Sequence, residues 1–188
     1  MKKILIATLV AFAGTASLEG CVTAHAYGQA VVTDAPSDNH LRIVIVPADP
    51  IPADKRNAAS IVAEQHMATL FPQLVARLPA DFRHNGVDAS ATLLDVGSAV
   101  PPPADVRTLV IRPAQAWFIG SGGGSSLEMQ VTLNDASRGV LWRGKIFMSS
   151  GTPASYGAAA VDRASIPLLE QLRDSKMIDI SWRRPEIP

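Results

Sequence analysis

The clearest pattern in the chain is a strict alternation of apolar and polar residues over 127–133. The apolar positions of this alternation are Leu127, Met129, Val131 and Leu133. A period of two predicts a strand with one buried and one wet face. Residues 134–139 are rich in turn formers, and 140–148 can return as a second strand. The segment 127–148 therefore predicts a β-hairpin, with the apolar set facing the core.

A second pattern has the period of a helix. Apolar residues recur every three or four positions at Ala63, Met67, Leu70, Leu74 and Leu78. This spacing predicts a long amphipathic helix. Two prolines, at 72 and 79, predict a kink or a break into two pieces. The helix should end at Asn85-Gly86, because glycine readily forms the left-handed cap.

The other elements follow from shorter patterns. Residues 41–46 predict a central strand, 88–94 a second strand, and 108–118 a third, in which Pro113 indicates an edge position or a bulge. Pro101-Pro102-Pro103 favours an extended loop. A second helix is expected over about 154–175, with Pro167 inside it. The order β-α-β-β-β-β-α predicts one α+β domain, with two helices on one face of a mixed or antiparallel sheet.

The N-terminus has the pattern of a signal peptide over residues 1–20. Lys2 and Lys3 precede an apolar run over 4–13. Ten residues of helix span roughly 15 Å, about half the apolar core of a bilayer. We therefore expect cleavage of this segment. No later segment approaches the ~18 apolar residues of a membrane-spanning helix.

The expected cleavage region contains the chain's single cysteine. Leu18-Glu19-Gly20-Cys21 resembles the lipobox of bacterial lipoproteins, except that Glu19 replaces a small uncharged residue. Lipidation of Cys21, with acyl chains such as palmitate, would hold the mature protein on a membrane. Val22 rather than Asp follows, which by the known sorting rule implies the outer membrane, facing the periplasm. Ordinary cleavage after Ala24-His25-Ala26 is the alternative.

No period runs through residues 22–40, so 21–40 is expected to form a flexible lipidated tether, followed by the α+β domain over 41–180. The chain carries 17 Lys+Arg and 17 Asp+Glu. This balance gives no electrostatic reason to bind nucleic acid. One cysteine excludes a disulfide within the chain and any multi-cysteine metal site.

The remaining candidates for chemistry form no recognisable catalytic or metal-binding pattern. His25 and His40 fall in the expected tether, and His66 and His84 would lie roughly 27 Å apart on a straight helix, both exposed to solvent. The glycine-rich loop 120–124 lacks the phosphate-binding pattern and predicts a flexible connection, with partner binding as the alternative. We therefore expect no cofactor, no metal and no enzyme activity.

Three aromatic residues stand on neighbouring predicted strands: Trp117, Phe118 and Trp142. Packing in the core or across strands is the first interpretation. If they faced outward together, they would form a groove for lipid or protein.

The element order behind a lipobox resembles small Gram-negative envelope lipoproteins: the lipopolysaccharide-assembly lipoprotein, auxiliary lipoproteins of ABC transporters, and the domain shared by curli-secretion lipoproteins and the TolB N-terminus. Asp135 to Gly144, with Trp142 near its end, is similar to a hairpin common among them. The resemblance covers most of 41–175. It implies an accessory module that supports an envelope transport or assembly machine through a protein partner. A carrier of a small apolar ligand or lipid is the alternative.

Overall fold

The computed structural model describes residues 22–103, 105–119, 124–150 and 157–180. The expected signal peptide, Cys21 and most of the loop 120–124 lie outside the described residues. The elements are β1 (Thr23–Ala30), β2 (His40–Ile45), α1 (Ala58–His84), β3 (Asp88–Leu93), β4 (Arg107–Ile119), β5 (Gly124–Asp135), β6 (Gly139–Ser150) and α2 (Ala158–Asp174), with a short 3-10 helix at Ala53–Lys55.

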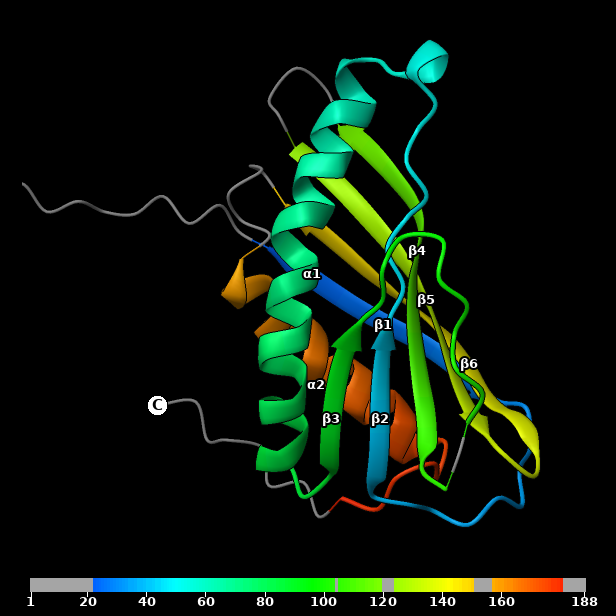
Figure 1. Ribbon diagram of the computed structural model, residues 1–188. Coiled ribbons are helices and arrows are strands. Elements are labelled where there is room, and N and C mark those ends of the chain that lie inside the picture. Colours follow the sequence, from blue (N-terminus) through cyan, green and yellow to red (C-terminus); the bar gives the residue numbers. More distant parts are fainter. Residues whose placement is uncertain (1–21, 104, 120–123, 151–156, 181–188) are drawn as a thin grey trace, which may run out of the picture.

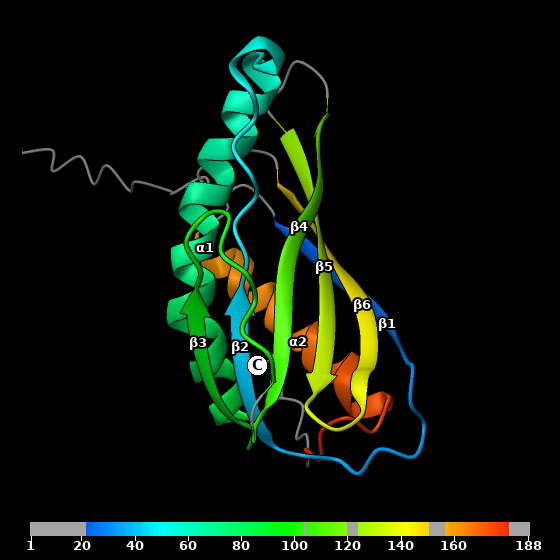
Figure 2. The same cartoon turned by 45° about the vertical axis from the view of Figure 1, so that its right-hand side comes forward.

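The described strands form one mixed sheet in the order β1-β6-β5-β4-β2-β3. β2 is parallel to both of its neighbours, β3 and β4, while the other pairs are antiparallel. Both helices lie on the same face of the sheet (Figures 1 and 2). This confirms the predicted α+β class with two helices on one face, and the interior position of β2. No described helix is both long enough and apolar enough to cross a bilayer.

The predicted hairpin lies in the interior of the sheet. β5 and β6 pair antiparallel from Ser125 to Asp135. The apolar set of the alternation is buried, with Val131 fully inaccessible, whereas Gln130 is exposed and Thr132 half-buried on the outer face. The inward side chains pack against Leu168, Leu169 and other apolar residues of the helices in a single core cluster. The alternation therefore predicted the facing of this strand correctly.

α1 is one continuous helix through both prolines, so the predicted break is wrong. Its apolar stripe is buried on both sides of Pro72 and Pro79, from Leu70 to Phe82. Packing of this stripe offsets the roughly 3 kcal/mol that an interior proline costs. The end of the helix is as predicted. Gly86 has φ +81°, and the N–H of Val87 donates to the carbonyl of Phe82 at 3.0 Å, which completes a Schellman cap.

The expected tether over 21–40 is wrong for residues 23–30, which form β1 at the edge of the sheet. This strand pairs with β6 along its whole length, from Thr23 opposite Ser149 to Ala30 opposite Trp142. Its odd-numbered residues are exposed and its even-numbered ones are partly or fully buried. Val22, immediately before it, is 3% exposed. The folded domain therefore includes Val22 and β1, which precede residue 41.

Trp142 fills a slot that two glycines leave open. Gly28 on β1 and Gly144 on β6 stand directly opposite one another in the sheet. A Cβ atom on Gly28 would lie 1.8 Å from Cζ2 of the indole. The indole N–H donates to Ser175 Oγ at 3.0 Å, which fixes the orientation of the ring. Trp142 is thus a core residue, as the first interpretation of the aromatic residues held.

β4 extends well beyond its parallel neighbour. β2 pairs with β4 only over 107–111, while β5 pairs with β4 as far as Ile119. The register shifts between Pro113 and Gln115, so the proline lies at a bulge, as predicted. Beyond that bulge, within the described residues, β4 has a strand on one side only.

The proline-rich segment before β4 covers part of the outer face of the sheet, the face opposite the helices. Arg42 on β2 donates to the carbonyl of Pro102 at 3.0 Å. Thr108 and Val110 on β4, which also face outward, are buried. The outer face is therefore shielded over β2 and β4 and open over β5, β6 and β1.

Candidate functional site

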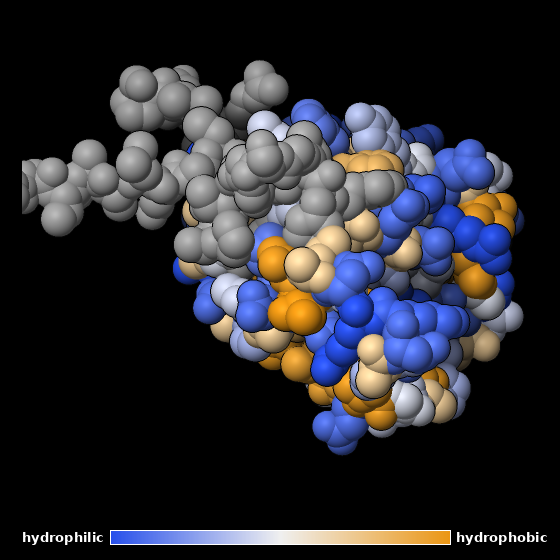
Figure 3. Space-filling model, turned by 90° about the horizontal axis from the view of Figure 1, so that it is seen from above, coloured by the Kyte–Doolittle hydropathy of each residue, from blue (hydrophilic) through white to orange (hydrophobic). Residues whose placement is uncertain are grey.

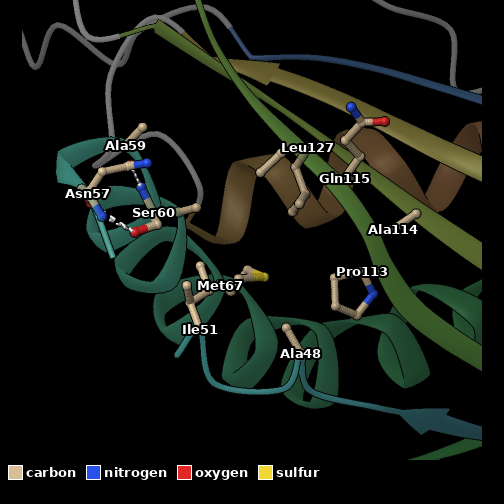
Figure 4. Close-up of a pocket in the computed structure, with 12 residues that line it drawn as sticks. Ala48, Ile51, Asn57, Ala59, Ser60, Met67, Pro113, Ala114, Gln115 and Leu127 are labelled. Carbon is tan, nitrogen blue, oxygen red and sulfur yellow. Dashed lines mark hydrogen bonds between the residues drawn. The ribbon is translucent and has the colours of Figure 1, made fainter. Parts of the chain in front are cut away.

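A surface groove of about 350 Å³ lies between the first half of α1 and the part of β4 that extends past β2. We call it the α1–β4 groove. Its lining residues are Ala48, Ile51, Asn57, Ala59, Ser60, Ala63, Met67, Pro113, Ala114, Gln115, Ala116 and Leu127. Figure 4 shows Met67, Leu127 and Pro113 directed into the space between the helix and the strand. The groove exists because β2 ends at Ile45 and leaves this length of β4 without a second neighbour.

A capping box fixes the helical wall of the groove. The backbone N–H of Ser60 donates to Asn57 Oδ1 at 2.9 Å, and the N–H of Asn57 donates to Ser60 Oγ at 2.9 Å. The segment before α1, which forms another wall of the groove, is held to the same helix. Glu64 on α1 accepts a hydrogen bond from Arg56 at 2.8 Å and one from the N–H of Ile51 at 3.4 Å. These contacts position the start of α1 and the approach to it before any partner binds.

The chemistry of the groove is apolar and uncharged. Its lining contains small alanines, a flexible methionine and a branched Ile51, together with neutral polar groups and no ionisable side chain. Methionine adapts to varied apolar shapes. Viewed from the end of the molecule where α1 starts, hydrophobic residues lie in small groups among hydrophilic ones (Figure 3), and the lining of the groove itself is apolar and uncharged. Such a surface suits an apolar peptide segment better than a charged ligand.

Below the groove, the fold brings together two residues that are 59 positions apart in sequence. His66 Nδ1 on α1 and Ser125 Oγ on β5 are hydrogen-bonded at 3.0 Å. The expectation that His66 is exposed is wrong, because it is 5% exposed, and Ser125 is 2% exposed. Burial lowers the pKa of His66 below its ordinary 6.5. The neutral imidazole therefore acts as a polar tie between α1 and the sheet.

A serine beside a neutral histidine is also half of a nucleophilic arrangement. Here both side chains are buried, at 5% and 2% exposure, between α1 and β5. Sequence reasoning missed this pair because nothing local relates position 66 to position 125. The apolar stripe on α1 offered a partial signal, since His66 lies within it.

The other histidines are dispersed. His25, His40 and His84 are exposed, on β1, β2 and the last turn of α1. His40 Nδ1 lies 3.1 Å from Asp38 Oδ1. Within the ranges that the structure describes, no three His, Cys, Asp or Glu side chains are grouped as metal ligands would be. Trp117 and Phe118 stand on the extended part of β4, but their side chains are outside the described part of the structure.

A second hollow, of about 650 Å³, lies on the open part of the outer face. We call it the outer-face hollow. Its lining side chains come from β1, β5 and β6 and include Tyr27, Gln29, Gln130, Thr132, Arg143 and Lys145. Lys145 forms an ion pair with Glu128 at 2.8 Å. In contrast to the α1–β4 groove, this surface is cationic and aromatic.

No family model and no curated protein matches the chain. Similar solved structures include two PelC dodecamers from Paraburkholderia phytofirmans. A variant form is 16% identical, with a TM-score of 0.39, over 76% of this chain and 96% of that one. The other form is 15% identical, with a TM-score of 0.38, over 78% and 97%.

Proposed function

We propose that this protein is a lipid-anchored accessory module of the bacterial envelope, which binds a protein partner through the α1–β4 groove. In this role it supports a transport or assembly machine from the periplasmic side of the outer membrane. The observation that carries the proposal is a preformed, uncharged, apolar groove beside a length of β4 that pairs with only one strand among the described residues. An extended apolar segment of a partner can lie along residues 115–119 of that edge and place side chains in the groove.

The alternative, a carrier of a small apolar ligand, receives less support. A carrier of this architecture would hold its ligand between the sheet and the helices. In this protein that interface is occupied by fully buried large side chains, among them Phe82, Leu74, Met129 and Trp142. The hollows described above open instead on the surface of the domain. The packed interior and the surface groove together favour protein binding over ligand carriage.

β1 supports anchoring at Cys21. The alternative cleavage after Ala26 would start the mature chain at Tyr27 and remove the first half of β1, Thr23–Ala26. It would also remove Val22, which is 3% exposed, and Ala26, which is 7% exposed, from the core cluster. Cleavage before Cys21 leaves the whole strand intact. We therefore propose Cys21 as the first residue of the mature protein and as its site of lipid attachment.

The proposal assigns no catalytic residue, no cofactor and no metal to the protein. His66 and Ser125 hold α1 to β5 in this account, so their replacement should change stability rather than remove an activity. The function is measured instead by whether a partner protein binds at the α1–β4 groove.

The test is site-specific photocrosslinking in the living cell. A photoreactive amino acid at Ala116, an exposed residue that lines the groove, should yield a discrete adduct with one envelope protein. The same amino acid at Ser90, an exposed position on β3, should not.

Two matched substitutions on α1 complete the test. Ala59→Arg places a large cation in the groove and should abolish the Ala116 adduct. Ala76→Arg, at an exposed alanine of the same helix outside the groove lining, should leave it unchanged. Equal adducts from both variants, at equal protein levels, would contradict the groove as the partner site.

A further inference from the structure

The outer-face hollow is not used by the proposed partner contact, and its residues are of a different kind. Cross-strand register aligns Tyr27, Lys145, Gln130 and Arg112 in one row across β1, β6, β5 and β4. With strands about 4.8 Å apart, Arg112 lies roughly 10 Å from Lys145. Arg143 lies two residues before Lys145 and therefore on the same face of β6. The open half of the outer face thus presents Arg143 and Lys145 in the hollow, with the exposed Arg112 on β4 at its border, beside the proline-rich segment.

Two of these cations are available for an external anion. Lys145 is engaged by Glu128, as noted above. Arg112 and Arg143 are both exposed, and neither has an ion-pair partner among the residues that the structure describes. On the solvent side of α2, in contrast, Asp162 and Asp174 are paired with Arg77 and Arg173. The outer face therefore presents two exposed arginines without an ion-pair partner among the described residues, which an external anion can bind.

The same face carries an exposed aromatic side chain. Tyr27 is 60% exposed, and its ring packs edge-on against Phe147 with the centroids 6.0 Å apart. A tyrosine that combines an apolar ring with a polar hydroxyl is typical of surfaces at the level of lipid headgroups. Aromatic and cationic side chains on one face are the combination that a phospholipid surface favours.

The proposed anchor at Cys21 is joined to β1 without a flexible linker. Val22 is buried, and the guanidinium of Arg163 on α2 donates to its carbonyl oxygen. The Cα of Cys21 can be only about 3.8 Å from that of Val22. Tyr27, five residues further along an extended strand, lies roughly 17 Å from Val22. A lipid on Cys21 therefore holds the beginning of β1 at the bilayer surface, within reach of the outer face.

We infer that the outer face over β1, β6 and β5, with Arg112 at its border on β4, rests on the phospholipid surface, with Arg112, Arg143 and Lys145 on headgroup phosphates and Tyr27 at the headgroup level. This inference rests on the proposed acylation of Cys21. It orients the protein, because the sheet lies against the membrane while the helices face the periplasm.

The experiment measures which face approaches the bilayer. The acylated mature chain has no free thiol other than one introduced by design, since Cys21 is its single cysteine. Gln29→Cys on the outer face and Gln65→Cys on α1, both at exposed glutamines, are labelled with a fluorophore. Each protein is reconstituted in vesicles of phosphatidylethanolamine and phosphatidylglycerol that contain a lipid with a nitroxide on its headgroup.

The inference predicts that the label at residue 29 loses most of its emission, while the label at residue 65 keeps most of it. Adding Arg112→Glu and Arg143→Glu should restore much of the emission at residue 29, with unchanged thermal unfolding. Equal quenching at the two positions, or stronger quenching at residue 65, would overturn the inference and leave the anchor intact. An intact mass without acyl chains would overturn both the lipid anchor and the membrane contact. The mass therefore distinguishes failure of the anchor from failure of the membrane contact alone.

Discussion

The slot around Trp142 gives a sharp test of the packing. Gly28→Ala places a methyl group where the three nearest atoms all belong to the indole, at 1.8, 2.4 and 2.7 Å. The ring cannot turn aside without losing its hydrogen bond to Ser175 and displacing the core beneath it. Overpacking of this kind costs about 1–3 kcal/mol and sometimes more. We expect the free energy of unfolding to fall by about 3 kcal/mol, or roughly 6–12 °C in Tm.

The destabilisation caused by Gly28→Ala should depend on the presence of the Trp142 indole. Removing the clash leaves only the usual effect of glycine to alanine, a gain of about 0.4–1 kcal/mol where the backbone accepts alanine. Gly28→Ala should therefore be neutral or slightly stabilising in a Trp142→Leu background. Gly139→Ala is the control. Its cost comes from φ +71° in the hairpin turn, with no atom within 4 Å of the added methyl, and should be the same in both backgrounds.

The assay is equilibrium denaturation of the four proteins of a double-mutant cycle, with Gly28→Ala and Trp142→Leu alone and together. The structure predicts a coupling of about 3 kcal/mol between the two positions. If Gly28→Ala costs the same with and without the indole, the slot described here does not exist, and β1 does not pack as the register indicates.

Two further outcomes follow from the hairpin and the buried histidine. Val131→Asp should destabilise the protein by several kcal/mol, because it buries an unpaired carboxylate, whereas Thr132→Asp on the outer face should cost little; equal melting temperatures would show the facing to be wrong. Burial lowers the pKa of His66, so the unfolded chain takes up the proton first as the pH falls through 6.5. Stability should therefore decline as the pH falls through 6.5, and His66→Gln should reduce that decline; an unchanged pH dependence in thermal unfolding would assign it to other groups.

Local patterns predicted most of this fold, and the failures have identifiable physical causes. The hairpin was predictable because Val131 and its neighbours alternate strictly between apolar and polar. β1 was missed although it also alternates, because its inward residues are small. Ala24, Ala26 and Gly28 carry little hydrophobic signal, and at Gly28 the indole of Trp142 takes the space that a larger side chain would fill. Polar and small residues did alternate in this segment, but the small residues gave only a weak hydrophobic signal.

Other errors arose where tertiary packing outweighs a local preference. Pro72 and Pro79 predict a break in any isolated helix, but the apolar stripe on either side of them is buried against the sheet and keeps α1 continuous. The contact of His66 with Ser125 depends on how α1 lies across β5, which no local pattern specifies. The α1–β4 groove is likewise a consequence of topology. It depends on where β2 stops relative to β4, which requires strand order and register.

The proposal that Cys21 is the lipidated first residue of the mature protein is tested most directly by mass spectrometry of its N-terminal peptide. The protein would be expressed from its full gene and purified from membranes in detergent. We predict a peptide that begins at Cys21 and carries two or more acyl chains, because one chain gives only marginal membrane binding. Cys21→Ser should lack this mass and appear in the soluble fraction. A wild-type chain that begins at Tyr27 without acyl mass would contradict the account, because β1 would then be cut in half.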